Sequence, residues 1–180
     1  TFGMAAGLVF MSGGRIELGR ATLREGRYTG IEATSGSLVL RDVAVDSIRS
    51  ATDPMGGSND AVGLRIAAGV RIEAGRVRAT AIDGHGLVLE GGGSDDEVAR
   101  SIEDLFVSEV LQAEGQGTGI LLGDGAQDVA FARVRVDGVE GAGLVLERGV
   151  VLSGSDLSVR DVATGLEARG ASDATIAGLS

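Results

Sequence analysis

The only histidine of the chain, His85, stands between two glycines. Imidazole titrates near neutral pH, so a carboxylate beside it would supply the two groups that general acid–base chemistry requires. Segments 49–62 and 111–118 lie on either side of His85 in the sequence and carry further polar residues. The residues that we expect to converge on one binding site are Asp53, Asn59, Asp60, His85 and Glu114. The candidates for catalysis within this set are His85, Asp60 and Glu114.

A second group of side chains has the chemistry to bind a hard metal ion. Calcium is held by about six oxygen ligands, which clustered carboxylates can supply. The candidate calcium ligands are Asp95, Asp96, Glu97, Asp124 and Asp128. A solvated acidic loop is the alternative interpretation, and no cofactor other than Ca²⁺ is expected.

All of these residues are set in a repeat that must position them. Glycine followed by leucine or isoleucine recurs at Gly7, Gly30, Gly63, Gly86, Gly119, Gly143 and Gly165. The spacings are 23, 33, 23, 33, 24 and 22 residues, so a unit near 23 is lengthened in two copies. Apolar residues alternate after each glycine, which predicts a strand. A second block carries apolar or small residues at relative positions 1, 3, 6, 8 and 11, as in Leu38, Leu40, Val43, Val45 and Ile48.

The step from position 3 to position 6 of the second block breaks the alternation, so the chain must bend there to keep both flanking strands facing inward. We therefore expect three short strands, of two to five residues, and three corners in each unit. Parallel strands without intervening helices require a chain that coils back to its starting side, and stacked units then share one core. The sequence predicts an all-β fold, a single-stranded parallel β-helix (a solenoid) of about seven coils of 22–24 residues with corner insertions, in one domain over residues 1–180. Arg100 occupies one position where an apolar residue is expected.

This repeat resembles the right-handed parallel β-helix repeat of the pectate-lyase-like superfamily over nearly the whole chain. The resemblance implies a right-handed coil. It implies little about activity, because that superfamily includes lyases, hydrolases, epimerases, phage tailspikes, adhesins and proteins without known chemistry. The pectate lyases themselves use clustered aspartates to hold Ca²⁺ and an arginine as the base.

The segment around His85 is similar to the Gly-His-Gly motif of the polygalacturonase family. In that family the residues preceding the first strands of the earlier coils supply catalytic carboxylates, and the matching positions here are Thr29 and Val62. Neither side chain can act as an acid or a base. The Arg-Ile-Lys motif of the family falls on Leu121, Leu122 and Gly123. These departures count against that hydrolase activity.

Length variation is confined to three corners, residues 49–62, 91–100 and 111–118. The first and the last of these occupy the same corner on coils two steps apart, and the short turn that contains His85 lies on the coil between them. Loops on a rigid scaffold commonly carry function. The arrangement predicts a trough around His85, bordered by two corners that are more mobile than the coils.

One outward position alternates in charge from coil to coil. Its occupants are Arg20, Asp42, Arg76, Asp104, Arg133 and Asp156. Stacked at the strand spacing of about 4.8 Å, they would form a column of opposite charges that favours one register over its neighbours. We call these six residues the charge column.

Composition excludes several classes of function. With a net charge of -10 and few aromatic residues, the chain lacks the basic surface and the stacking side chains of nucleic-acid-binding proteins. There is no Cys for disulfides or thiolate metal sites, and no apolar stretch is long enough to insert into a membrane. The pattern begins and stops within a coil, which favours a segment of a longer protein.

Three functions are compatible with the sequence. The first is a non-catalytic β-helix scaffold or recognition segment of a secreted or cell-surface bacterial protein, with a polysaccharide or another surface protein as its partner. The second is a polysaccharide lyase or glycoside hydrolase that acts in the trough around His85. The third is a polymer-forming β-helix that resembles the bactofilins.

Overall fold

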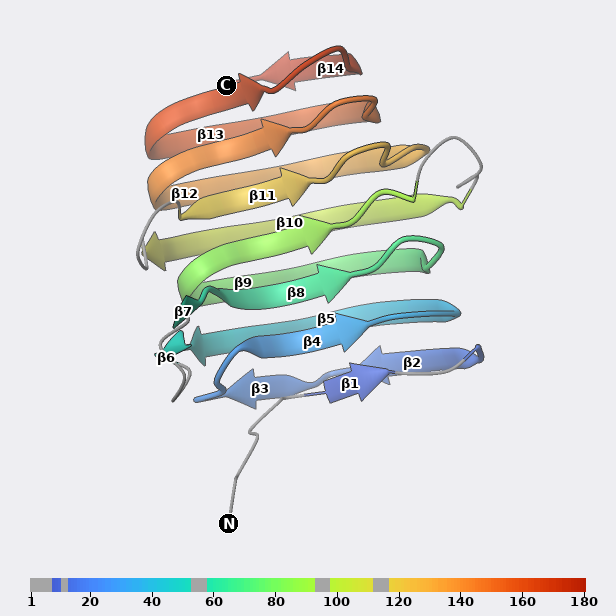
Figure 1. The fold of residues 1–180 in the computed structure, drawn as a ribbon, viewed down its shortest axis with the longest axis vertical. Helices are drawn as coiled ribbons and strands as arrows, with labels where there is room; N and C mark the ends of the chain where they lie inside the picture. Colours follow the sequence, from blue (N-terminus) through green and yellow to red (C-terminus); the bar gives the residue numbers. More distant parts are fainter. Residues whose placement is uncertain (1–7, 11–12, 53–57, 93–97, 112–116) are drawn as a thin grey trace.

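The computed structural model describes residues 8–10, 13–52, 58–92, 98–111 and 117–180. The chain forms a parallel β-solenoid of about six turns, each stacked on the preceding one (Figure 1). The described residues contain no helix. The all-β, parallel-coil prediction is therefore confirmed. The seven first strands are separated by six steps, so the number of turns is slightly below the seven coils expected.

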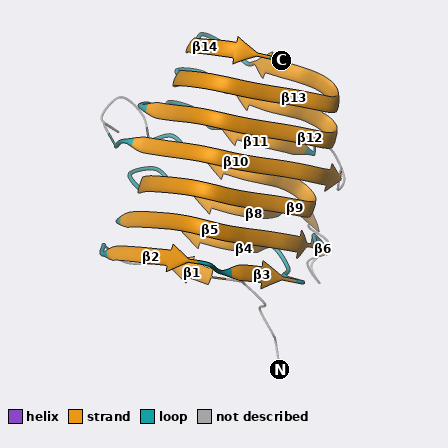
Figure 2. Cartoon of the chain, turned by 180° about the vertical axis from the view of Figure 1, so that it is seen from behind, coloured by secondary structure: helices purple, strands orange, loops and turns teal. Residues whose placement is uncertain are grey.

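One twelve-stranded sheet winds around the core (Figure 2). Strands β6 and β7 form a separate antiparallel pair. In chain order the strands are β1 (Leu8–Phe10), β2 (Arg15–Gly19), β3 (Thr22–Arg24), β4 (Thr29–Ala33), β5 (Ser37–Ile48), β6 (Ala51–Thr52), β7 (Ser58–Asn59), β8 (Ala61–Ile66), β9 (Arg71–Leu89), β10 (Arg100–Leu111), β11 (Thr118–Leu122), β12 (Val129–Leu146), β13 (Val151–Ala168) and β14 (Asp173–Leu179).

The residue that follows each repeated glycine stacks on its counterpart in the next coil, as the repeat predicts. The parallel register joins Leu8, Ile31, Leu64, Leu87, Ile120, Leu144 and Leu166 in one column. Its members from Ile31 to Leu144 are buried, whereas Leu166, in the last coil, is 42% exposed. The column thus forms one edge of a continuous apolar core.

Close packing explains why the repeat requires glycine. A Cβ atom at Gly86 would meet Cγ1 of Val107 and would lie 2.6 Å from the carbonyl oxygen of Gly119. A Cβ added at Gly30, Gly63 or Gly119 would likewise lie 2.6 Å from the carbonyl oxygen of the next repeated glycine. Each glycine therefore allows the first strand to approach the opposite wall of its own coil.

The expectation of very short strands is wrong. Strands β5, β9, β10, β12 and β13 run for 12 to 19 residues and pass through the corners. A single residue with positive φ bends the chain at each of these corners, so the hydrogen-bond ladder between coils continues on both sides. The first such column is the charge column, with φ between 52° and 58° at all six residues. The second column consists of Glu25, Ser47, Ala81, Glu109, Gly138 and Asp161.

The core is aliphatic apart from Phe131 and runs through all the described inner coils. Arg100 is buried within it, in register between Ile72 and Val129. Its backbone N–H donates a hydrogen bond to the carbonyl oxygen of Asp128 at 3.1 Å. The described residues include no helix with the length and apolar character of a membrane span.

Candidate functional site

His85 lies on the outer surface near the end of β9. Its register partners are Val62 in β8 and Thr118 in β11, and both are buried. The preceding residue, Gly84, has a φ of 149°, and a Cβ there would clash with the carbonyl oxygen of Ala61 and lie 2.8 Å from the Ala61 backbone nitrogen. Glycine before His85 is therefore required by the close approach of β8 and β9, which gives the Gly-His-Gly segment a structural explanation.

The His85 side chain is 18% exposed, and its Nε2 atom lies 3.9 Å from Oδ2 of Asp60. Its Nδ1 atom is buried and has no hydrogen-bond partner among the described residues. Burial lowers the pKa of His85, and the nearby charge of Arg65 acts in the same direction, whereas Asp60 opposes both. The imidazole is therefore neutral at pH 7, which leaves it able to accept a proton.

The structure brings Asp60 and His85 together and describes little else of the expected trough. Asn59 belongs to β7, which pairs with β6 immediately before Asp60. Asp53 and Glu114 lie outside the described residues, as do the central parts of both long corners. Of the five predicted binding residues, one pair of side chains is thus placed in contact.

Two of the candidate calcium ligands are described. The carboxylate of Asp124 accepts hydrogen bonds from the backbone N–H and from Nη2 of Arg148, both at 3.1 Å. Asp128 is exposed, with a φ of 52°. Asp95, Asp96 and Glu97 lie outside the described residues. Within the described ranges, no three His, Asp or Glu side chains gather closely enough to hold one metal ion.

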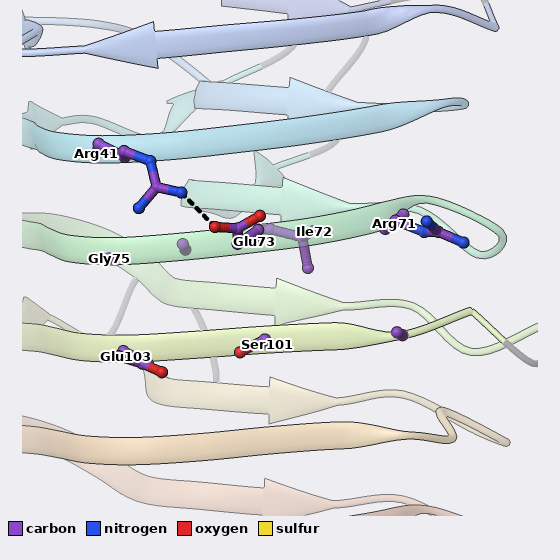
Figure 3. A pocket seen from close by; sticks show the side chains of 9 residues that line it. Arg41, Arg71, Ile72, Glu73, Gly75, Ser101 and Glu103 are labelled. Atoms are coloured by element: carbon purple, nitrogen blue, oxygen red, sulfur yellow. Dashed lines mark hydrogen bonds and ion pairs between the residues drawn. The ribbon is translucent and has the colours of Figure 1, made fainter.

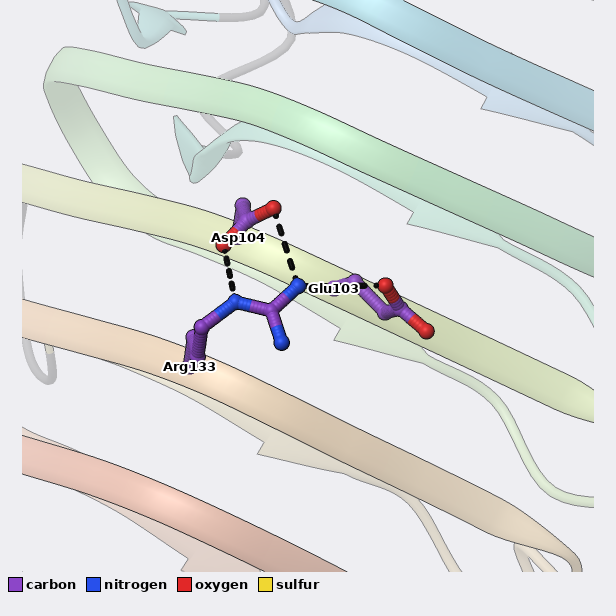
Figure 4. Close-up of polar contacts among 3 residues, drawn as sticks. All are labelled: Glu103, Asp104 and Arg133. Carbon is purple, nitrogen blue, oxygen red and sulfur yellow. Dashed lines mark hydrogen bonds and ion pairs between the residues drawn. The ribbon is translucent and has the colours of Figure 1, made fainter.

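The charge column has the predicted register, but its contacts are grouped into pairs. Nη2 of Arg76 donates to Oδ2 of Asp42 at 2.9 Å, and Nε donates to the other oxygen of the same carboxylate. Arg133 binds Asp104 in the same two-pronged manner, through Nε at 2.5 Å and Nη2 at 3.1 Å (Figure 4). These hydrogen bonds lower the pKa values of Asp42 and Asp104 from their ordinary range.

A depression on the outer face of β9 and β10 was not expected from the repeat. Its volume is about 470 Å³. Its polar lining comes from Arg41 in β5, Arg71 and Glu73 in β9, and Ser101 and Glu103 in β10, with Gly75 at one side (Figure 3). The depression therefore crosses three successive coils.

Gly75 opens this depression. The equivalent outward position on the other coils holds Gly19, Arg41, Glu103, Ala132, Ser155 and Ala177. A Cβ on Gly75 would meet no atom within 4 Å, and its φ is not positive. Neither close packing nor backbone geometry requires glycine here. The sequence signal that could have revealed the depression was this outward glycine within a strand.

Ion pairs border the depression on two sides. Arg41 donates to Oε1 of Glu73 on one side. On the other, Nη2 of Arg133 lies 3.2 Å from Oε2 of Glu103, while the same arginine also binds Asp104 (Figure 4). The depression thus combines carboxylates, guanidinium groups and the hydroxyl of Ser101 around a small floor.

No family model, curated protein or solved structure matches this chain. Inferences about its function consequently depend on the geometry of its own residues.

Proposed function

We propose that this chain is a non-catalytic β-helix segment of a secreted or cell-surface protein, in which a rigid solenoid presents a recognition surface for a polysaccharide. The observation that carries this proposal is the depression at Gly75. Its lining offers hydrogen-bond donors and acceptors at fixed positions on a packed sheet, and such an arrangement suits a ligand rich in hydroxyl groups. Another surface protein is the alternative partner.

We also place the fold in the pectate-lyase-like superfamily, with a right-handed coil. The support for this is the repeated glycine with its fixed apolar spacing, together with the parallel stacking of the coils. Our proposal includes secretion or display at the cell surface, where a scaffold of this kind could bind its ligand.

Filling the depression tests the recognition surface. Because a side chain at Gly75 meets open space, Gly75→Phe should leave the fold intact and block access to the floor. Ser155→Phe is the matched control, since Ser155 occupies the same outward column three coils further on and does not line the depression. We expect Gly75→Phe to weaken binding of glycans recovered from an array at least tenfold, with Ser155→Phe unaffected. Equal binding by the two variants would reject the depression as the site.

A carbohydrate-active enzyme is the second candidate, because Asp60 and His85 lie within 3.9 Å of each other. A lyase or hydrolase that used this pair would turn over members of an acidic polysaccharide panel, tested with and without Ca²⁺. His85→Gln would then abolish turnover, whereas Gly75→Phe would not. Absence of turnover across the panel would leave the recognition function as the proposal.

A further inference from the structure

We propose that His85 acts as a pH-dependent contact that opens one corner of the solenoid in mild acid. The part that moves is the antiparallel pair of β6 and β7 (Ala51–Thr52 and Ser58–Asn59), which we call the corner hairpin. When His85 takes up a proton, the corner hairpin detaches from the neighbouring coils while these coils stay folded. This behaviour is independent of ligand binding at the Gly75 depression.

The imidazole of His85 is packed for its neutral form. An imidazolium has two N–H donors and needs an acceptor for each of them. Nδ1 of His85 is buried and meets no acceptor among the described residues. Nε2 lies 3.9 Å from Oδ2 of Asp60, which is beyond hydrogen-bond distance. A proton on His85 would thus leave buried N–H groups unsatisfied, and the side chain would gain free energy by reaching water.

The charges that face His85 offset its burial only in part. Burial lowers the pKa of His85 most, Asp60 raises it, and Arg65 in β8 lowers it again. Arg65 lies 3.8 Å from Glu90, and the neighbouring strand β11 places the uncharged Thr118 in register with His85. An opened corner would return the pKa towards about 6.5, so the open form binds the proton more readily than the closed form. The open population should therefore rise as the pH falls below about 6.5.

The corner hairpin is the element beside His85 that can move at the lowest cost. Among the described strands, β6 and β7 pair only with each other and do not belong to the twelve-stranded sheet. Figure 1 shows them at one side of the solenoid, next to β5 and β8. By contrast, β8 and β11, the strands on either side of His85, belong to the ladder between coils and supply buried residues to the core. Segments with few buried contacts open at a much lower free energy than core strands.

Asp60 connects the corner hairpin to the imidazole. It directly follows β7, and its Cβ would lie 3.0 Å from a Cβ added at Gly84, which precedes His85. Displacement of the hairpin therefore carries Asp60 away from His85. The other arm is anchored, because Nη1 of Arg49, just before β6, donates a hydrogen bond to Asp83 at 2.8 Å. The corner should thus open at its Asp60 end.

Hydrogen exchange measured by NMR at pH 7.5 and pH 5.5 tests this inference. The rates are compared as protection factors, which removes the intrinsic effect of pH on exchange. We expect the protection of the β6 and β7 amides to fall about fivefold at pH 5.5, while the β5 amides keep theirs. His85→Gln cannot take up the proton and should show equal protection at both pH values. Asp60→Asn should enlarge the loss, because it removes the carboxylate that favours the imidazolium.

A second measurement does not depend on any variant. His85 is the only histidine, so its imidazole signal can be titrated without overlap. The midpoint of this titration should coincide with the midpoint of the loss of protection in the corner hairpin. Different midpoints would overturn the proposal, as would a loss that persists in His85→Gln. An equal loss in β5 would show that acid loosens the whole solenoid instead. Higher protection at pH 5.5 would show that Asp60 closes onto the imidazolium, and would overturn the proposal too.

Discussion

At the scale of single residues, the surroundings of His85 determine its charge. Burial lowers its pKa, because transferring an imidazolium ion from water into a packed environment is unfavourable. Asp60, at 3.9 Å, offsets only part of this effect. Protonation of His85 in mild acid should therefore destabilise the fold.

The folded protein should lose stability in mild acid through His85. Since the folded pKa lies below the unfolded value of about 6.5, the unfolded chain binds the proton more readily. The free energy of unfolding should thus fall as the pH drops from about 6.5 towards the folded pKa. Urea unfolding between pH 7.5 and pH 5 should show this loss in the native sequence and a smaller loss in His85→Gln. Parallel curves for the two proteins would contradict the assignment.

The charge column offers a second test at the residue scale. Asp104 forms two hydrogen bonds with Arg133, whereas Asp156 makes no ion pair with the described residues. Both have positive φ, which asparagine tolerates well, so substitution by asparagine isolates the charge. At low salt we expect Asp104→Asn to lower the melting temperature more than Asp156→Asn. The difference should vanish at 1 M salt, where the screening length is about 3 Å. A difference that persists at high salt would point to packing instead of charge.

At the scale of elements, two features together define each coil: the positive-φ corners and the column of repeated glycines that precede the first strands, which we call the glycine column. Glycine allows the first strand to lie against the opposite wall, as Gly86 does against Val107. The corner residues turn the chain without interrupting the parallel ladder, which is why β9 extends over 19 residues. Coil geometry thus depends on backbone approach as much as on apolar burial.

The glycine column should respond to substitution according to its neighbours. Gly86→Ala would place a Cβ against Val107 and 2.6 Å from the Gly119 carbonyl oxygen, so β9 and its partners must shift. We expect a loss of about 1–3 kcal/mol, typical of overpacking. Gly165→Ala is the control, since its Cβ would meet no atom within 4 Å. Chemical denaturation measures both, and equal stabilities would show that contact is not the reason for glycine.

At the scale of the whole molecule, one core connects all the described coils. Each coil buries its apolar residues against the coils before and after it, so damage to an inner coil affects both neighbours. The coils at the ends have fewer such contacts. The same substitution should therefore have different costs along the solenoid.

Val136 and Val151 provide this comparison. Val136 is fully buried in β12, and Val151 is 42% exposed at the start of β13. Val136→Asp places a carboxylate in the core and should cost about 3 kcal/mol or more. Val151→Asp should change stability by about 0.5 kcal/mol or less. Thermal unfolding distinguishes the two, and an unchanged melting temperature for Val136→Asp would contradict the described core.

The period of the repeat was sufficient to predict the parallel β-solenoid, the buried column from Ile31 to Leu144 and the register of the charge column. These features follow from the sequence because coil length, side-chain alternation and stacking are properties of the chain order itself. Asp60 and His85 lie close together for the same reason, since corners of neighbouring coils are adjacent.

Other features depend on the tertiary structure. The length of the strands was mispredicted, because a single residue with positive φ can bend a strand without ending its hydrogen-bond ladder. The depression at Gly75 is lined by residues on different coils, such as Glu73 and Glu103, whose relation appears only when the coils are stacked. Sequence alone determined which residues face outward on each coil. Only the packed structure decided which outward side chains pair with each other and which leave an opening, because those choices depend on side-chain reach between coils.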